Sequence, residues 1–259
     1  MKIFLISIGL ISLVVAYLAF SGPVPSPIKP TLSPTPIISL SIAPPLQSID
    51  FNHNGKTYRI AWLAIRDLTS LSLIPNFTQK RTAQSLIDTK ECREMVSGGF
   101  YTTDDEPTGL FISQGTTIRK AIPNALLNGY FVINEDSVVS ILQSPPDGSV
   151  RIALQTGPML IQHGIPLNLS IRDDEFARRI GVGMTTKSNV IFWAIYDPDN
   201  TGSGPKLSEV PQILKKFISL SGVNLLDAIN LDGGSASAFI RDDFSLQELT
   251  NVGSFFCIR

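Results

Sequence analysis

The sequence predicts an α+β fold, a single β-rich mixed domain, because short apolar runs outnumber helical patterns. These runs are rich in β-branched and aromatic residues and end at turn-forming residues, as strands usually do. Strands and helices do not alternate regularly, which disfavours a doubly wound α/β fold. With 259 residues, of which 43% are hydrophobic, the chain can bury one good-sized core or two small ones.

The N-terminus is typical of an export signal. After Lys2, residues 3–20 form an apolar run without a charged side chain. This run is long for a cleaved signal and just long enough for a spanning helix, which favours an uncleaved anchor over cleavage near Ser21. Residues 1–21 are therefore predicted to be a signal peptide or membrane anchor that forms a hydrophobic helix. With Lys2 on the cytoplasmic side, the rest of the chain would be membrane-anchored or secreted, and extracytoplasmic.

Residues 22–48 are predicted to be a stalk. Proline recurs there at short intervals, which prevents regular backbone hydrogen bonding and favours extended conformations. No second linker interrupts the periodic segments that follow, so one folded domain is expected over residues 49–259.

Within this domain, most elements are expected to be strands. The predicted strands cover residues 56–65, 109–112, 130–133, 137–142, 150–155, 159–162, 190–196 and 226–229. Helices are expected over residues 82–89 and 208–220. In the second helix Ser208 is the expected N-cap and Pro211 falls in the tolerant first turn. Its apolar face is formed by Val210, Ile213, Leu214, Phe217 and Ile218.

Charge and composition exclude several classes of protein. The net charge is -1 and no run of Lys or Arg exceeds two residues, so the chain lacks the positive field of a nucleic-acid-binding protein. Two histidines and two cysteines without close metal-ligand spacing argue against a structural zinc site. Cys92 and Cys257 either form one disulfide outside the cytoplasm or remain two buried free thiols.

Three glycine-containing clusters each close an apolar run: residues 97–101, 155–160 and 230–236. In the third, Asp232 follows a predicted strand, and the glycines after it would let backbone or ligand approach closely. A reactive carboxylate is one interpretation of this pattern, and an Asp-Gly hairpin turn is the other. Gly98 and Gly99 are equally well explained by a β-bulge.

Other side chains suggest chemistry less directly. Arg178 and Arg179 precede a glycine-spaced strand, and guanidinium groups bind phosphate or carboxylate in a bidentate manner. Neither histidine lies in a glycine cluster, so a seryl or cysteinyl nucleophile would lack its usual base. The acidic segments 104–106 and 196–200 either bind a cation such as calcium or form solvated turns. No cofactor is predicted.

Taken together and in order, these clusters resemble the phosphodiester glycosidase family. The resemblance covers about residues 55–258. The segments that carry it are Gly98-Gly99-Phe100-Tyr101, Pro107-Thr108-Gly109-Leu110, Gly115, Gln155-Thr156-Gly157-Pro158-Met159-Leu160, Arg179-Ile180-Gly181-Val182-Gly183 and Asn230-Leu231-Asp232-Gly233-Gly234-Ser235. It implies a β-rich domain that hydrolyses a sugar from a phosphodiester, so the expected partner is a carbohydrate or glycosyl phosphate.

Residue roles follow from the resemblance. Asp232 is the expected catalytic or substrate-orienting carboxylate, and Arg179 the expected phosphate or sugar clamp. The expected substrate-binding surface consists of Gly98, Gly99, Thr156, Gly157, Gly234 and Ser235. One carboxylate can suffice, because a phosphomonoester leaving group has a second pKa of about 6 and departs without protonation.

This chain departs from the family pattern at two places. Ser97 stands where an Asn commonly precedes the Gly-Gly-Phe segment, and two glycines follow Asp232 where many relatives have three. A catalytically idle module that binds an envelope glycan is therefore an alternative. A hydrolase of ordinary glycosidic bonds is another, and it would require a second carboxylate, such as Asp197 or Asp104, near Asp232.

Overall fold

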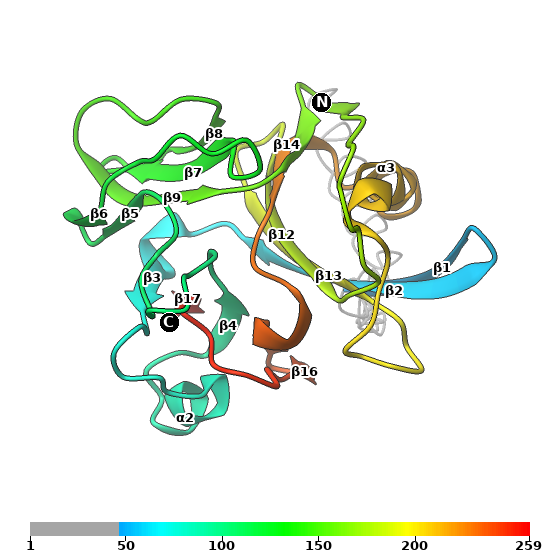
Figure 1. The fold of residues 1–259 in the computed structure, drawn as a ribbon, viewed down its shortest axis with the longest axis horizontal. Coiled ribbons are helices and arrows are strands. Elements are labelled where there is room, and N and C mark those ends of the chain that lie inside the picture. Colours follow the sequence, from blue (N-terminus) through cyan, green and yellow to red (C-terminus); the bar gives the residue numbers. More distant parts are fainter. Residues whose placement is uncertain (1–46) are drawn as a thin grey trace, which may run out of the picture. The chain divides into compact units, whose positions relative to one another are not determined.

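Residues 47–259, which the computed structural model describes, form three antiparallel sheets (Figure 1). The largest has the order β1 (Ser48–His53), β2 (Lys56–Ile65), β13 (Val190–Tyr196), β12 (Arg179–Thr185), β14 (Leu225–Asn230), β10 (Met159–Gln162) and β11 (Ile165–Pro166). The second has the order β16 (Phe244–Leu246), β15 (Phe239–Arg241), β4 (Glu94–Ser97), β17 (Ser254–Ile258) and β3 (Leu71–Pro75). The third has the order β6 (Thr116–Arg119), β5 (Phe111–Ser113), β9 (Val150–Thr156), β7 (Gly129–Asn134) and β8 (Val139–Leu142).

Helices are few in this part of the chain. The α-helices are α2 (Ala83–Asp88) and α3 (Val210–Ser221), and short 3-10 helices are η1 (Leu68–Ser70), η2 (Leu207–Glu209) and η3 (Gly234–Ala236). The expected β-rich domain is therefore observed. The expected hydrophobic helix at residues 1–21 and most of the stalk lie outside the described residues. Among residues 47–259, no helix is long and apolar enough to cross a membrane.

Two hydrophobic cores cover the two faces of the large sheet. One face packs on the other two sheets, where the ring centroids of Phe131 and Phe192 each lie within 5.3 Å of that of Phe256. The opposite face packs on α3, where Trp62 and Phe217 meet edge to face at 5.1 Å. Each strand of the large sheet that lies between the cores is buried on both sides, which explains the continuous apolar run in β13.

Helix α3 has the predicted apolar face but a different cap. Asp174 accepts hydrogen bonds from the backbone amides of Leu207 and Ser208 at 2.8 and 2.9 Å. The Ser208 side chain does not cap α3, so the prediction of Ser208 as N-cap is wrong. A carboxylate from a distant loop satisfies the free amides instead, and that contact is not visible in local sequence. Gly222 ends the helix in the left-handed conformation with φ of 72°.

The two cysteines form a disulfide. Cys92 lies directly before β4 and Cys257 lies in β17, the strand that pairs with β4. The sequence alone did not distinguish a disulfide from two free thiols. The Cα atoms of the two cysteines are 5.4 Å apart, which lies within the usual range for a disulfide. The bond joins residues 165 positions apart and fixes the C-terminal strand to the second sheet.

Replacement of Cys92 and Cys257 by serine is expected to lower the free energy of unfolding by about 2 to 5 kcal/mol, because the bond restricts the unfolded chain over a long loop. Urea denaturation monitored by tryptophan fluorescence measures this change. Reduced wild type should unfold like the double variant. If oxidised wild type does so too, the disulfide contributes no stability.

Candidate active site

The segment that follows β14 lies where the three sheets meet (Figure 1). The amide of Leu231 donates to the carbonyl of Ile180 at 2.9 Å, and the amide of Asp232 donates to the carbonyl of Gly98 at 3.0 Å. The amide of Gly234 donates to the carbonyl of Arg178 at 2.8 Å. This segment does not form an Asp-Gly hairpin, because β14 and β15 belong to different sheets.

Two of the three glycine clusters lie directly against this segment. Ser97 donates its hydroxyl to the carbonyl of Asp232 at 3.2 Å. On the other side Thr156 donates its hydroxyl to the carbonyl of Asn230 at 2.7 Å, and the Asn230 amide group donates to the carbonyl of Gly157 at 3.1 Å. The structure therefore brings together clusters that are far apart in sequence, as the family pattern implies.

Close packing within the protein explains the glycines at positions 98 and 99. A Cβ atom at Gly98 would lie 2.3 Å from the hydroxyl oxygen of Ser254, and one at Gly99 would lie 2.7 Å from a methyl group of Leu154. By contrast, Gly234 adopts a left-handed conformation with φ of 62°, and nothing lies within 4 Å of the Cβ position. Of the predicted substrate-binding residues, Gly234 and the exposed Ser235 therefore face open space most clearly.

Asp232 as a whole residue is partly exposed to solvent, but protein atoms surround its carboxyl group closely enough to shift its pKa. Burial raises its pKa from the ordinary value of 3.8 to about 7, although a hydrogen bond from the Gly233 backbone opposes the shift. A carboxyl group that titrates near neutrality can both accept and donate a proton under physiological conditions. Perturbed carboxyl groups of this kind are frequent at catalytic sites.

Tyr101 is close enough to Asp232 for the charge of that carboxyl group to affect its hydroxyl group. It follows the Gly98-Gly99 pair, and its hydroxyl group donates to the carbonyl of Asn251. Burial and the charges of Asp232 and Asp105 raise the pKa of this hydroxyl group, while the charge of Lys80 lowers it. The aromatic ring is partly exposed, so Tyr101 can offer both an apolar face and a hydroxyl group to a ligand.

Arg178 supports the site from the protein interior. Its guanidinium group is 2% exposed and donates to the hydroxyl and carbonyl oxygens of Ser237 at 2.8 and 2.5 Å. It also donates to the carbonyl of Gln247 at 3.0 Å. These bonds hold the turn that follows Asp232, so Arg178 is a positioning residue.

Arg179, the predicted phosphate clamp, is engaged elsewhere. Its guanidinium group donates to the carbonyls of Pro205, at 2.9 Å, and Glu175, and it lies 3.6 Å from the Asp174 carboxylate. Since Asp174 also caps the N-terminal end of η2, Arg179 joins the loop before β12 to the helix η2. None of these contacts brings the guanidinium group of Arg179 to Asp232.

The acidic segments that could have bound calcium form turns and ion pairs. Asp105 pairs with Lys80, Glu106 pairs with Arg119, and the Asp197 carboxylate accepts the Asp199 amide at 2.9 Å. Across residues 47–259, no group of three or more His, Cys, Asp or Glu side chains is arranged to hold a metal ion.

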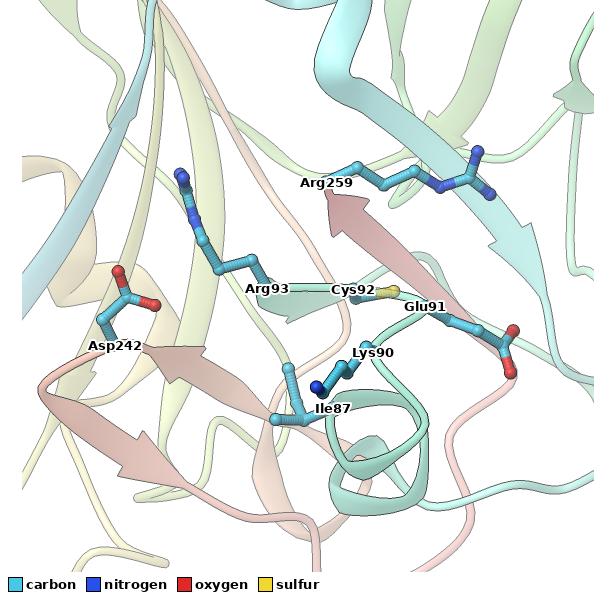
Figure 2. Close-up of a pocket in the computed structure, with 7 residues that line it drawn as sticks. All are labelled: Ile87, Lys90, Glu91, Cys92, Arg93, Asp242 and Arg259. Carbon is cyan, nitrogen blue, oxygen red and sulfur yellow. The ribbon is translucent and has the colours of Figure 1, made fainter.

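One large hollow lies away from these residues. It has a volume of about 580 Å³, lies beside the disulfide and is lined by Lys90, Cys92 and Arg93 among others. Figure 2 shows that the Arg93 and Arg259 side chains point in different directions, so they do not converge on one ligand. Its lining includes no residue of the candidate site, and we assign no function to it.

Sequence reasoning missed several residues that build the site. Tyr101 and Asn230 stood in the family motifs but were given no role. Nothing in the sequence marked Ser254, whose hydroxyl group is buried beside Gly98 and, within the described part of the chain, has no hydrogen-bond partner. Arg178 could not be separated from Arg179, because both precede the same strand.

Replacement of Arg178 by leucine is expected to lower the free energy of unfolding by about 3 kcal/mol, because buried carbonyls lose a charged donor. The matched variant Arg66→Leu, at an exposed arginine, should change it by less than about 0.5 kcal/mol. Urea denaturation of both variants measures the difference. Equal free energies of unfolding for the two variants would contradict a structural role of Arg178.

The shifted pKa of Asp232 makes stability depend on pH. Between pH 3.8 and about 7 the folded state keeps a proton on Asp232 that the unfolded state has released. The contribution of Asp232 to the free energy of unfolding therefore falls as pH rises through this window. The free energy of unfolding of Asp232→Asn minus that of wild type should therefore be larger at pH 8 than at pH 5. Urea denaturation at both pH values measures this, and a constant difference would contradict the shift.

Known proteins share the sequence pattern and the fold of this chain. The sequence profile described as phosphodiester glycosidase matches residues 90–258. The fold is similar to the catalytic domain of zebrafish N-acetylglucosamine-1-phosphodiester alpha-N-acetylglucosaminidase, auto-inhibited by its pro-peptide, with a TM-score of 0.66, 18% identity and 85% of each chain covered.

A hypothetical protein from Synechocystis is also similar, with a TM-score of 0.62 and 14% identity over 82% of this chain and 61% of that one. At these identities the structural matches establish the fold. No curated protein sequence matches significantly. Because the matching profile spans more than half of the 259 residues, the chain belongs to the phosphodiester glycosidase family.

Proposed function

We propose that this protein hydrolyses the bond between a sugar and a phosphate in a glycosyl phosphodiester. The observation that carries this proposal is a carboxyl group with a pKa of about 7, Asp232, set where the family's glycine clusters meet. Family membership supports the reaction class.

In the proposed step, Asp232 acts as the general base. A water oxygen attaches to the anomeric carbon while the bond from that carbon to the phosphate oxygen breaks. The electron pair of the broken bond leaves with the phosphomonoester, which needs no proton because its second pKa is about 6. The proton of the water passes to the Asp232 carboxylate. Ordinary glycosidases need a second, protonated carboxyl group for a sugar alkoxide, and this reaction does not.

The proposed setting is extracytoplasmic, with an envelope polymer as the substrate. The Cys92–Cys257 disulfide supports this, since such bonds persist mainly in oxidising compartments. The apolar run at residues 3–20 supports it as well, because it has the composition of an export signal or membrane anchor. Attachment to the membrane through that segment remains part of this proposal.

Asp232→Asn in the full chain is expected to lower kcat for a sugar-1-phosphate diester by about 100-fold or more, because the general base is lost. Wild-type activity should rise with pH through about 7, as Asp232 ionises. The exposed Asp242→Asn is the matched control and should leave kcat unchanged. Sugar release from a panel of diesters and matched ordinary glycosides measures these effects.

Three other results of this experiment would change the assignment. Retained glycan binding without turnover of any diester would favour an idle glycan-binding module. Turnover of the ordinary glycosides alone would favour a conventional glycosidase. Full activity of Asp232→Asn on the diesters would remove Asp232 from the mechanism.

A further inference from the structure

A phosphodiester substrate brings a negative charge to an ionised Asp232, so the site needs a cation. This need rests on the proposed function. Arg179 is held by backbone carbonyls and Asp174, and Arg178 is buried against Ser237 and Gln247. Neither guanidinium group is therefore presented to a ligand, and the cation must come from another part of the molecule.

We propose that Lys80 binds the substrate phosphate, in a hollow that it lines together with Thr250 and Asn251. The hollow has a volume of about 280 Å³. Lys80 lies before α2, and its side chain is 44% exposed. Its ammonium group is a compact, mobile donor that can follow a phosphate oxygen.

Hydrogen bonds connect the wall of this hollow to the segment that contains Asp232. Thr250 contacts the Ser235 hydroxyl at 3.3 Å, and the backbone amide of Thr250 donates to the Ser235 carbonyl at 3.1 Å. The backbone carbonyl of Asn251 accepts a hydrogen bond from the Tyr101 hydroxyl group. Two residues that line the hollow are thus hydrogen-bonded to Ser235, three residues after Asp232, and to Tyr101, whose hydroxyl group is affected by the charges of both Asp232 and Lys80.

The present partner of Lys80 is easily replaced. Its ammonium group lies 2.6 Å from the Asp105 carboxylate, and both side chains are more than a third exposed, which makes the pair weak. A phosphate oxygen can take the place of this carboxylate. Lys80 and Asp105 both adopt left-handed backbone conformations, with φ of 49° and 59°. Such conformations are uncommon for residues other than glycine.

The other charged groups of the hollow are already engaged. Arg81 makes two hydrogen bonds to Glu91, at 2.8 and 2.7 Å. Glu248 accepts the amide of Ala83 at 2.7 Å with one oxygen, and its other oxygen is buried, so it is not exposed to a ligand in the hollow. Lys80 also lies outside residues 90–258, which match the family profile.

The test compares Lys80→Gln with Lys90→Gln in the full chain. Lys90 is the matched control, because it is exposed, also has a positive φ, of 57°, and lines the hollow beside the disulfide but not the one that Lys80 lines. For a sugar-1-phosphate diester, Lys80→Gln should raise KM by about tenfold with kcat nearly unchanged, as expected for loss of a charged hydrogen bond. Asp105→Asn, which frees Lys80, should lower KM, and Lys90→Gln should match wild type.

Calorimetric titration with inorganic phosphate provides a second measurement that does not need turnover. Lys80→Gln should weaken phosphate binding by about tenfold relative to wild type. Turnover by wild type with no change of KM or phosphate affinity in Lys80→Gln would overturn the role of Lys80 and leave the proposed function standing. If wild type turns over no diester, the proposed function fails, and equal or absent phosphate binding in both proteins would also overturn the phosphate site.

Discussion

The backbone from Asn230 to Gly234 depends on four carbonyl partners from three different segments of the chain. The amides of Asn230, Leu231, Asp232 and Gly234 donate to the carbonyls of Pro158, Ile180, Gly98 and Arg178, all at 2.8 to 3.0 Å. Buried amides without partners would destabilise the fold, so this irregular segment can exist only where all four acceptors converge. The four acceptors converge where the three sheets meet, and the candidate site lies there.

The same convergence controls the charge of the site. Protein atoms from several strands surround Asp232 and raise the pKa of its carboxyl group to about 7. Because the group is largely protonated below that pH, the fold avoids an unpaired buried charge in acid. Ionisation of the Asp232 carboxyl group near neutral pH then lowers the free energy of unfolding. Such a loss is typical of sites where reactivity and stability oppose each other.

Features set by local periodicity could be predicted from sequence. The strands over residues 56–65, 159–162 and 190–196 were predicted with the observed bounds, and α3 has the expected apolar face. The short strands β3, β4, β15, β16 and β17 were missed. They are three to five residues long, and the second sheet is stabilised by pairing between strands distant in sequence, which leaves little local pattern.

The candidate site was predictable only in part, for the same reason. The family motifs located Asp232 and the glycine clusters, and the structure brings them together. They could not show which atoms fill the space beside each glycine, since Ser254 and Leu154 come from strands distant in sequence, β17 and β9. Nor could they show that Arg179 is held by the loops at residues 174–175 and 205.

Electrostatics limits how such a site can recognise a phosphodiester. A guanidinium group that donates to several backbone carbonyls holds those loops in place, and a phosphate could take it over only by leaving the carbonyls unpaired. By contrast, replacing the exposed carboxylate that pairs with an exposed ammonium group by a phosphate costs much less free energy. The buried arginines therefore stabilise the geometry around Asp232, and recognition of substrate charge is best left to flexible side chains at the rim. Under the proposed function, this division would let the Asp232 carboxyl group keep the protein environment that raises its pKa while a substrate is bound from the solvent side.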